Sequence, residues 1–136
     1  MLRGKNTYER KTQNVVVRVE PEFLDEQSSP ADDRFIWAYT VEIENQGGED
    51  LQIVERYWQI TDRNGQMQEV RGEGVVGEKP NLKPGETFRY TSGAPLNAPS
   101  GIMLGSYQMR TQTGNKFDVE IPPFSLDSPF ERRSIN

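Results

Sequence analysis

The sequence predicts an all-β protein, an antiparallel β-sandwich of about seven strands. Three observations support this fold class. Apolar residues recur with a period of two, turn residues separate the resulting segments, and no segment has the period of a helix. The strongest segment alternates large apolar residues, which place one face of a strand in the core: Phe35, Trp37, Tyr39, Val41 and Ile43.

The elements before and after this strand follow the same pattern. Val15, Val17 and Val19 predict an earlier strand, and a polar loop at 26–33 separates the two. A third strand is expected over 51–62, but apolar residues fall on both of its faces. Either a β-bulge resets its register or both faces are partly covered.

Turn residues mark the remaining strands. Asn64-Gly65 predicts a tight turn into a short strand at 67–70, and Pro84-Gly85 precedes a strand marked by Phe88 and Tyr90. The last two strands form a hairpin around Thr113, Gly114 and Asn115, and they are marked by Met103, Tyr107, Met109, Phe117, Val119 and Ile121. Phe124 and Leu126 are expected to bring the exit segment back over the core.

The chain is expected to form a single domain over residues 14–126. We expect residues 1–13 to be loosely ordered and residues 127–136 to form a flexible tail. No apolar run approaches the length of a membrane span, and no secretory signal pattern is present, so a cytoplasmic location is the default expectation. The sequence leaves a monomer and a homodimer both open.

Charge and residue usage exclude several classes of function. The 136 residues carry 21 acidic and 16 basic side chains, a net charge of -5, which argues against a dedicated nucleic-acid binder. The chain has no cysteine and no histidine, so thiolate metal sites and the common Ser-His and Cys-His catalytic arrangements cannot be built. We therefore predict no catalytic residues, no metal site and no cofactor.

Two pairs of carboxylates invite a different interpretation. Asp118 and Glu120 share one strand face, as do Glu42 and Glu44, and such pairs are found in glycosidases and hard-metal sites. On a strand with a period of two, however, such pairs are more often the solvated face. We expect solvated faces here, with no more than weak Mg²⁺ or Co²⁺ association.

Gly72, Gly74 and Gly77 have the spacing G-x-G-x-x-G of a dinucleotide-binding loop. That fold needs a helix directly after the loop, whereas Pro80 and Pro84 follow here and would break one. We expect the glycines to provide positive φ angles and close backbone approach where the chain leaves one sheet for the other. A weak anion nest flanked by Arg71 and Lys79 is the alternative.

Several longer segments together resemble the bacterial ApaG family. The resemblance spans 15–129 and is carried by EQSSP (26–30), WAYTVEIEN (37–45), RYWQITD (56–62), EVRGEGVVGEKPNLKPGETFRYTSG (69–93), PSGIMLGSYQM (99–109) and FDVEIPPFSL (117–126). It implies a fibronectin type III-like, immunoglobulin-like sandwich with no established catalytic activity. It also implies a link to cobalt resistance and magnesium efflux, and the glycine loop corresponds to the family's proposed pyrophosphate-binding element. Tyr57 stands where many members have histidine.

These observations favour a non-enzymatic interaction module that docks a protein partner through a sandwich face or an edge strand. The related domains of eukaryotic F-box and DNA-polymerase-interacting proteins imply the same role. Arg56, Tyr57 and Arg71 are the candidate contact residues, since arginine and tyrosine are favoured at interface centres. The alternative is a sensor that binds a nucleotide polyphosphate or a divalent ion beside the glycine loop.

Overall fold

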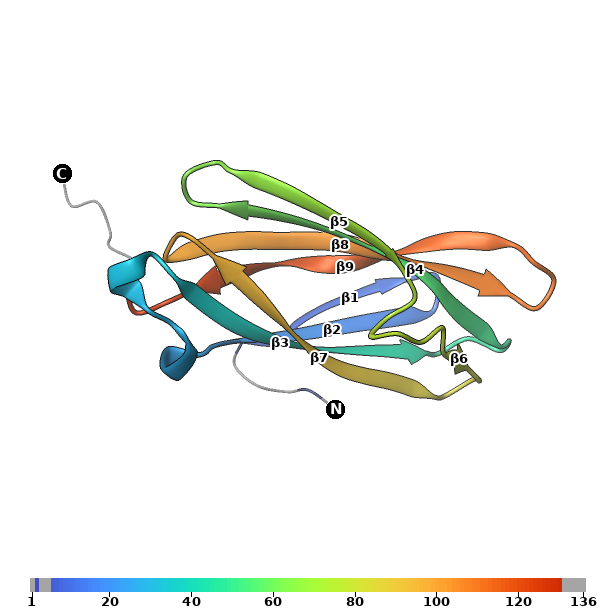
Figure 1. Ribbon diagram of the computed structural model, residues 1–136. Helices are drawn as coiled ribbons and strands as arrows, with labels where there is room; N and C mark the ends of the chain where they lie inside the picture. Colours follow the sequence, from blue (N-terminus) through green and yellow to red (C-terminus); the bar gives the residue numbers. More distant parts are fainter. Residues whose placement is uncertain (1, 3–5, 131–136) are drawn as a thin grey trace.

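The computed structural model describes residue 2 and residues 6–130, and it confirms the all-β sandwich (Figure 1). Within these residues the chain forms nine strands and two single-turn 3-10 segments (25–27 and 30–32). The strands are β1 (Tyr8–Thr12), β2 (Val15–Phe23), β3 (Phe35–Asn45), β4 (Leu51–Asp62), β5 (Met67–Glu73), β6 (Asn81–Leu82), β7 (Thr87–Leu96), β8 (Ser100–Thr111) and β9 (Lys116–Asp127).

The strands build two antiparallel sheets. The first has the order β1-β2-β3-β7, and the second has the order β5-β4-β8-β9, with the short β6 also paired to β4. The core lies between them, and its largest fully buried side chains include Trp37, Tyr107 and Phe124. The predicted inward face of β3 is confirmed, because all five of its alternating apolar residues are buried.

The structure corrects the expected limits of the domain. Residues 8–12, which we expected to be loosely ordered, form β1 and pair with β2 from Tyr8↔Val19 to Thr12↔Val15. The strand YERKT has no apolar alternation, so it depends on pairing with β2 rather than on a pattern of its own. At the other end, the Ser128 hydroxyl donates to the Pro99 carbonyl at 2.7 Å, while residues 131–136 of the expected tail lie outside the described residues.

A β-bulge explains the irregular pattern of β4. The pairing with β8 shifts register between Ile53 and Glu55, so that Val54 is the extra residue. The bulge changes which residues face inward, and this places both Ile53 and Trp58 in the core. Of the two explanations that the sequence left open, the structure selects the bulge.

The outer face of the first sheet carries a row of alternating charges. Glu9, Arg18, Glu42 and Arg89 occupy matching positions on β1, β2, β3 and β7. Arg18 Nε lies 2.8 Å from Glu9, and its Nη1 lies 3.8 Å from Glu42, while Arg89 lies 3.3 Å from Glu42. The expectation of a solvated face is wrong for Glu42, which is only 3% exposed because its neighbours and these ion pairs enclose it.

The two long sides of the sandwich differ. On the closed side, β1 meets β9: Arg10 pairs with Glu120 at 2.5 Å, and the Glu120 N–H donates to the Thr12 hydroxyl at 3.3 Å. On the open side, β5 and β7 are the edges, and no hydrogen bond or ion pair joins them within residues 6–130. Figure 1 shows the β4–β5 hairpin diverging from β7.

Candidate functional site

The glycine loop lies on the open side, between two segments that pair with the same strand. β5 pairs with β4 from Glu55↔Glu73 to Thr61↔Met67, and β6 pairs with it at Leu51↔Leu82. The loop therefore joins two parts of one sheet edge, and our expectation that it crosses between sheets is wrong. The crossing follows β6, where Gly85 has a φ of 87° and its N–H donates to the Asn45 carbonyl.

The centre of the loop is a tight two-residue turn. The N–H of Val75 donates to the Glu78 carbonyl at 2.7 Å, and the Glu78 N–H donates back to Val75 at 2.9 Å. The two residues between them, Val76 and Gly77, have φ angles of 44° and 81°. Positive φ at both central positions is the arrangement of a type I′ turn, which explains the third glycine. Val75 is fully buried, so the turn is anchored in the core.

The other two glycines make room for neighbouring groups. A Cβ at Gly74 would lie 2.1 Å from the carbonyl oxygen of Glu78, and the φ of Gly74 is 65°. A Cβ at Gly72 would lie 2.7 Å from the guanidinium of Arg56, which stands opposite it on β4. Gly74 therefore requires a residue without a side chain, whereas a side chain at Gly72 would displace the end of Arg56.

Arg56 holds the loop against β4. Its Nη1 donates to the carbonyls of Glu73 at 3.0 Å and of Gly74 at 3.1 Å, across the space left by Gly72. We predicted Arg56 as a partner contact, and the structure gives it this internal role as well. The sequence offers no signal for it, because Arg56 and Gly72 become neighbours only through the pairing of β4 with β5.

The predicted ligand-binding residues of the glycine loop do not form a site with free backbone N–H groups directed at an anion. The Gly74 N–H donates to the Val54 carbonyl at 2.8 Å, and the amides of Val75 and Glu78 bond each other within the turn. Lys79 pairs with Glu73 at 2.6 Å, and its hydrogen bond lowers the pKa of the Glu73 carboxyl. The strand β6 follows the loop, so no helix N-terminus faces it.

Tyr57 and Arg71 do come together, on the outer face of the second sheet. They stand opposite each other on β4 and β5, and the Arg71 guanidinium carbon lies 4.3 Å from the centre of the Tyr57 ring. The Tyr57 hydroxyl donates to Glu69 Oε2 at 2.5 Å, and this hydrogen bond raises the pKa of Tyr57. They border a depression of about 300 Å³ lined by Glu55, Arg56, Tyr57, Arg71, Ser106, Gln108 and Asp118.

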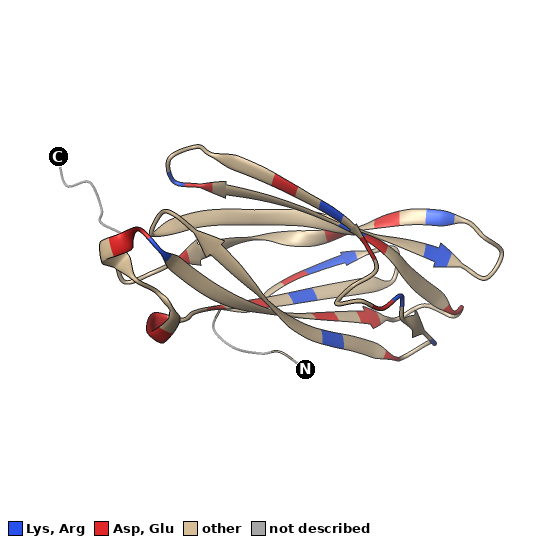
Figure 2. Cartoon of the chain, viewed as in Figure 1, with Lys and Arg blue, Asp and Glu red and all other residues tan. Residues whose placement is uncertain are grey.

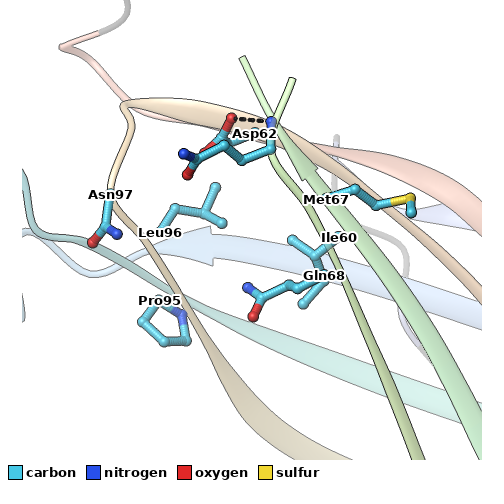
Figure 3. Close-up of a pocket in the computed structure, with 8 residues that line it drawn as sticks. Ile60, Asp62, Met67, Gln68, Pro95, Leu96 and Asn97 are labelled. Atoms are coloured by element: carbon cyan, nitrogen blue, oxygen red, sulfur yellow. Dashed lines mark hydrogen bonds between the residues drawn. The ribbon is translucent and has the colours of Figure 1, made fainter. Parts of the chain in front are cut away.

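A larger cleft opens between the β4–β5 hairpin and the end of β7 (Figure 3). Its volume is about 600 Å³, and it is lined by Ile60, Asp62, Gln66, Met67, Gln68, Pro95, Leu96 and Asn97. Ile60 and Leu96 are buried at its apolar wall, whereas the Met67 side chain is 53% exposed at its rim. This cleft could not be predicted from the sequence, because its walls come from strands of both sheets.

The structure assembles few groups suited to catalysis. Tyr90 and Tyr107 share a hydrogen bond between their hydroxyls, and burial raises the pKa of both, which keeps them protonated near neutral pH. Asp118 and Glu120 are exposed, as expected, and Glu120 pairs with Arg10. Among the described residues, no group of three or more Asp or Glu side chains is placed to hold a metal ion.

Comparison with known sequences decides the family. The model of the ApaG domain matches residues 25–111. The chain belongs to the ApaG family. It is 54% identical to the ApaG protein of Parvibaculum lavamentivorans and 56% identical to that of Methylocella silvestris, in each case over 129 residues, 95% of this chain and 99% of the relative.

Solved structures agree with the ApaG fold. The crystal structure of an ApaA protein from Bordetella pertussis is 46% identical, has a TM-score of 0.83, and is matched over 86% of this chain and 95% of that one. The C-terminal domain of Wzt is 11% identical with a TM-score of 0.53, matched over 98% of this chain and 84% of that one. That second likeness extends to the fold alone.

Proposed function

We propose that this ApaG-family protein is a non-enzymatic interaction module that docks a protein partner on the open side of its sandwich. The observation that carries the proposal is the stacking of the exposed Arg71 on the half-buried Tyr57 on the outer face of β4 and β5. An arginine stacked on an aromatic ring combines a large contact area with a fixed cation, and such residues are favoured at interface centres. Arg71 makes no ion pair in the described part of the chain, which leaves its charge available to a partner.

Charge distribution supports a protein partner over a nucleic acid. Figure 2 shows basic and acidic residues interspersed along the strands of both sheets, and Arg71 itself lies beside Glu69 and Glu73 on β5. The phosphate backbone of a nucleic acid binds best to a protein surface that carries mainly positive charges. A protein surface with its own mixture of charges is the better complement. In the described residues no helix is long and apolar enough to cross a membrane.

We propose that any effect of this protein on cobalt or magnesium homeostasis is exerted through the protein partner that it binds. Hard cations need several oxygen ligands converging on one point. The exposed carboxylates on β9 do not converge, since Glu120 is paired with Arg10. The module would then influence ion movement by binding a protein in the cytoplasm, the location expected from the sequence, and not by holding the ion itself.

The alternative, a sensor of nucleotide polyphosphates at the glycine loop, has less support from the geometry. Three loop amides are already bonded to backbone carbonyls. Arg71 stacks on Tyr57 and Lys79 pairs with Glu73, so neither cation is directed at a shared anion. Docking of a protein partner, in contrast, can occur without breaking any of these contacts.

Affinity capture with matched variants tests the proposal. The wild-type chain, the Y57A/R71A double variant and a K116A control are immobilised and exposed to native bacterial extract at physiological salt, and captured proteins are quantified by mass spectrometry. Lys116 is an exposed cation at the far end of β9, so K116A removes the same charge as R71A without touching the outer face of β5. We expect a partner that wild type and K116A retain and that the double variant loses by about tenfold. Equal capture by all three proteins would contradict the proposed surface.

A further inference from the structure

We infer that β5 is a self-complementary edge through which two copies of this chain form a dimer, pairing antiparallel about Val70 and joining their sheets into one. This inference deepens the proposed function, because it names a second copy as one partner of the open side. It rests on the state of the four sheet edges, on the direction of the free backbone groups of β5, and on the order of its charges.

Of the four strands that end the two sheet orders, β5 is the one that contains no proline and that no other strand within residues 6–130 covers. β9 contains Pro122 and Pro123 and lies against β1, to which it is joined by the Arg10–Glu120 pair. β7 contains Pro95, which cannot donate a hydrogen bond to an added strand. Edges are commonly blocked by proline or by a covering element, and β5 has neither.

Hydrogen bonds at both ends of the β4–β5 pairing determine which backbone groups of β5 face β4 and which face outward. The Asp62 N–H donates to the Gln66 carbonyl at 2.9 Å, and the Gly74 N–H donates to the Val54 carbonyl at 2.8 Å. Antiparallel pairs alternate between hydrogen-bonded and non-bonded positions, so Gln68, Val70 and Gly72 also bond to β4. The N–H and C=O groups of Met67, Glu69 and Arg71, which lie between these residues, point outward, whereas the Glu73 carbonyl accepts from Arg56.

The charged side chains of β5 are complementary to those of a second, antiparallel copy of the same strand. When two copies of β5 pair about Val70, Glu69 of each copy stands opposite Arg71 of the other, and the outward-facing backbone groups meet one another. Pairing about Glu69 or about Arg71 instead places like charges face to face. Opposite charges stabilise a cross-strand pair and like charges destabilise it. Pairing about Gly72 would also place Arg71 opposite Glu73, but the Glu73 carboxylate already pairs with Lys79 and its carbonyl accepts from Arg56, which favours the register centred on Val70.

This register also covers groups that are exposed in a single chain. Val70 is 39% exposed, and it would lie beside its own copy. Arg71 would gain a carboxylate from Glu69 of the other copy while still stacking on Tyr57. The contact is isologous, so it closes on itself as a dimer and does not extend into a filament.

Sedimentation velocity of the full chain, from about 10 µM to about 1 mM, tests the inference in its simplest form. We expect a reversible monomer–dimer equilibrium. E69R and R71E each replace both Glu–Arg pairs by like-charge pairs, and each is expected to weaken dimerisation by about tenfold or more. K116E changes the net charge as R71E does, but at the far end of β9, and is expected to dimerise like wild type.

Charge exchange separates a specific register from a general loss of stability. The E69R/R71E double variant restores both opposite-charge pairs with reversed sign, and we expect its dimerisation to return to within about threefold of wild type. An equimolar mixture of E69R with R71E should form a heterodimer that neither forms alone. Circular dichroism confirms that each variant is folded.

A wild-type chain that stays monomeric throughout the concentration range overturns the inference, as does a dimer insensitive to E69R and R71E or one that the double variant does not restore. These outcomes leave the proposed function standing, because capture of a different protein through Tyr57 and Arg71 is measured separately. Loss of that capture with an intact, charge-dependent dimer would overturn the proposed function and retain the dimer.

Discussion

The closed and open sides of this sandwich are built from similar strands but end differently. On the closed side, β1 covers the edge of the core, and the rings of Tyr8 and Phe124 lie 6.0 Å apart across the gap between the sheets. On the open side, all residues of β5 except Gly72 are exposed, and the cleft of about 600 Å³ separates its hairpin from β7. The difference indicates that one side stabilises the fold and the other presents a surface.

The largest expected effect comes from truncating an apolar side chain on each side. Phe124 is 1% exposed and contacts the rings of Tyr8, Tyr39 and Trp58, so F124A should reduce the free energy of unfolding by about 3–5 kcal/mol. V70A on the open side should cost about 0.5 kcal/mol or less. Urea denaturation of both variants gives the two values, and similar losses would remove the energetic distinction between the sides.

The next largest difference is expected between substitutions of two arginines, the buried Arg18 and the exposed Arg71, in their effect on the free energy of unfolding. Burial by itself would lower the pKa of Arg18, but hydrogen bonds to Glu44 and Glu9 outweigh it and raise the pKa. R18M removes one ion-pair partner of the buried Glu42, which keeps Arg89 at 3.3 Å, and should cost about 3 kcal/mol, at the lower end for a broken buried pair. R71M should change stability by about 0.5 kcal/mol, since Arg71 is exposed. A large loss for R71M would mean that Arg71 serves the fold.

The glycine loop offers a comparison within the open side. G74A places a Cβ against the Glu78 carbonyl at a φ of 65°, so the loop must move, and we expect a loss of about 2–3 kcal/mol. G77A meets open space at a φ of 81° and should lose only about 1 kcal/mol, the cost of a left-handed backbone. Thermal melts at matched concentration measure both. The reverse order would show that the loop is not packed as described.

The smallest expected signal concerns polyphosphates. Calorimetric titration of the chain with diadenosine tetraphosphate, ATP, Mg²⁺ and Co²⁺ should give no saturable heat in the micromolar range, because the amides of Gly74, Val75 and Glu78 are already bonded. A K79A variant provides the control for a charge-driven response. Saturable binding that K79A abolishes would revive the sensor and would require those amides to be released.

Much of the fold could be predicted from the sequence because the core strands carry their own pattern. The alternation of β3 and the turn at Asn64-Gly65 are local signals, and both are found where predicted. The absence of a helix after the glycines was likewise readable from Pro80 and Pro84. Local patterns of this kind survive folding because they specify which face of each strand is buried.

The remainder depends on contacts between strands far apart in the chain. β1 has no apolar alternation and forms because β2 pairs with it. Arg56 holds the loop carbonyls only after β4 and β5 have come together. Glu42 is buried by contacts with Arg18 and Arg89 on neighbouring strands and with the Leu2 N–H. One sequence does not show which strands pair with each other, so the roles of these residues could not be predicted from it.

Amide hydrogen exchange along β5, followed residue by residue by NMR at two protein concentrations, tests the central claim most directly. In dilute solution the amides of Gln68, Val70 and Gly72, bonded to β4, should exchange slowly, while those of Glu69 and Arg71 exchange fast. At high concentration Glu69 and Arg71 should also become protected as the second copy pairs with them. Uniform protection of β5 in dilute solution, or fast exchange of Glu69 and Arg71 at every concentration, would contradict an open edge that a partner strand completes.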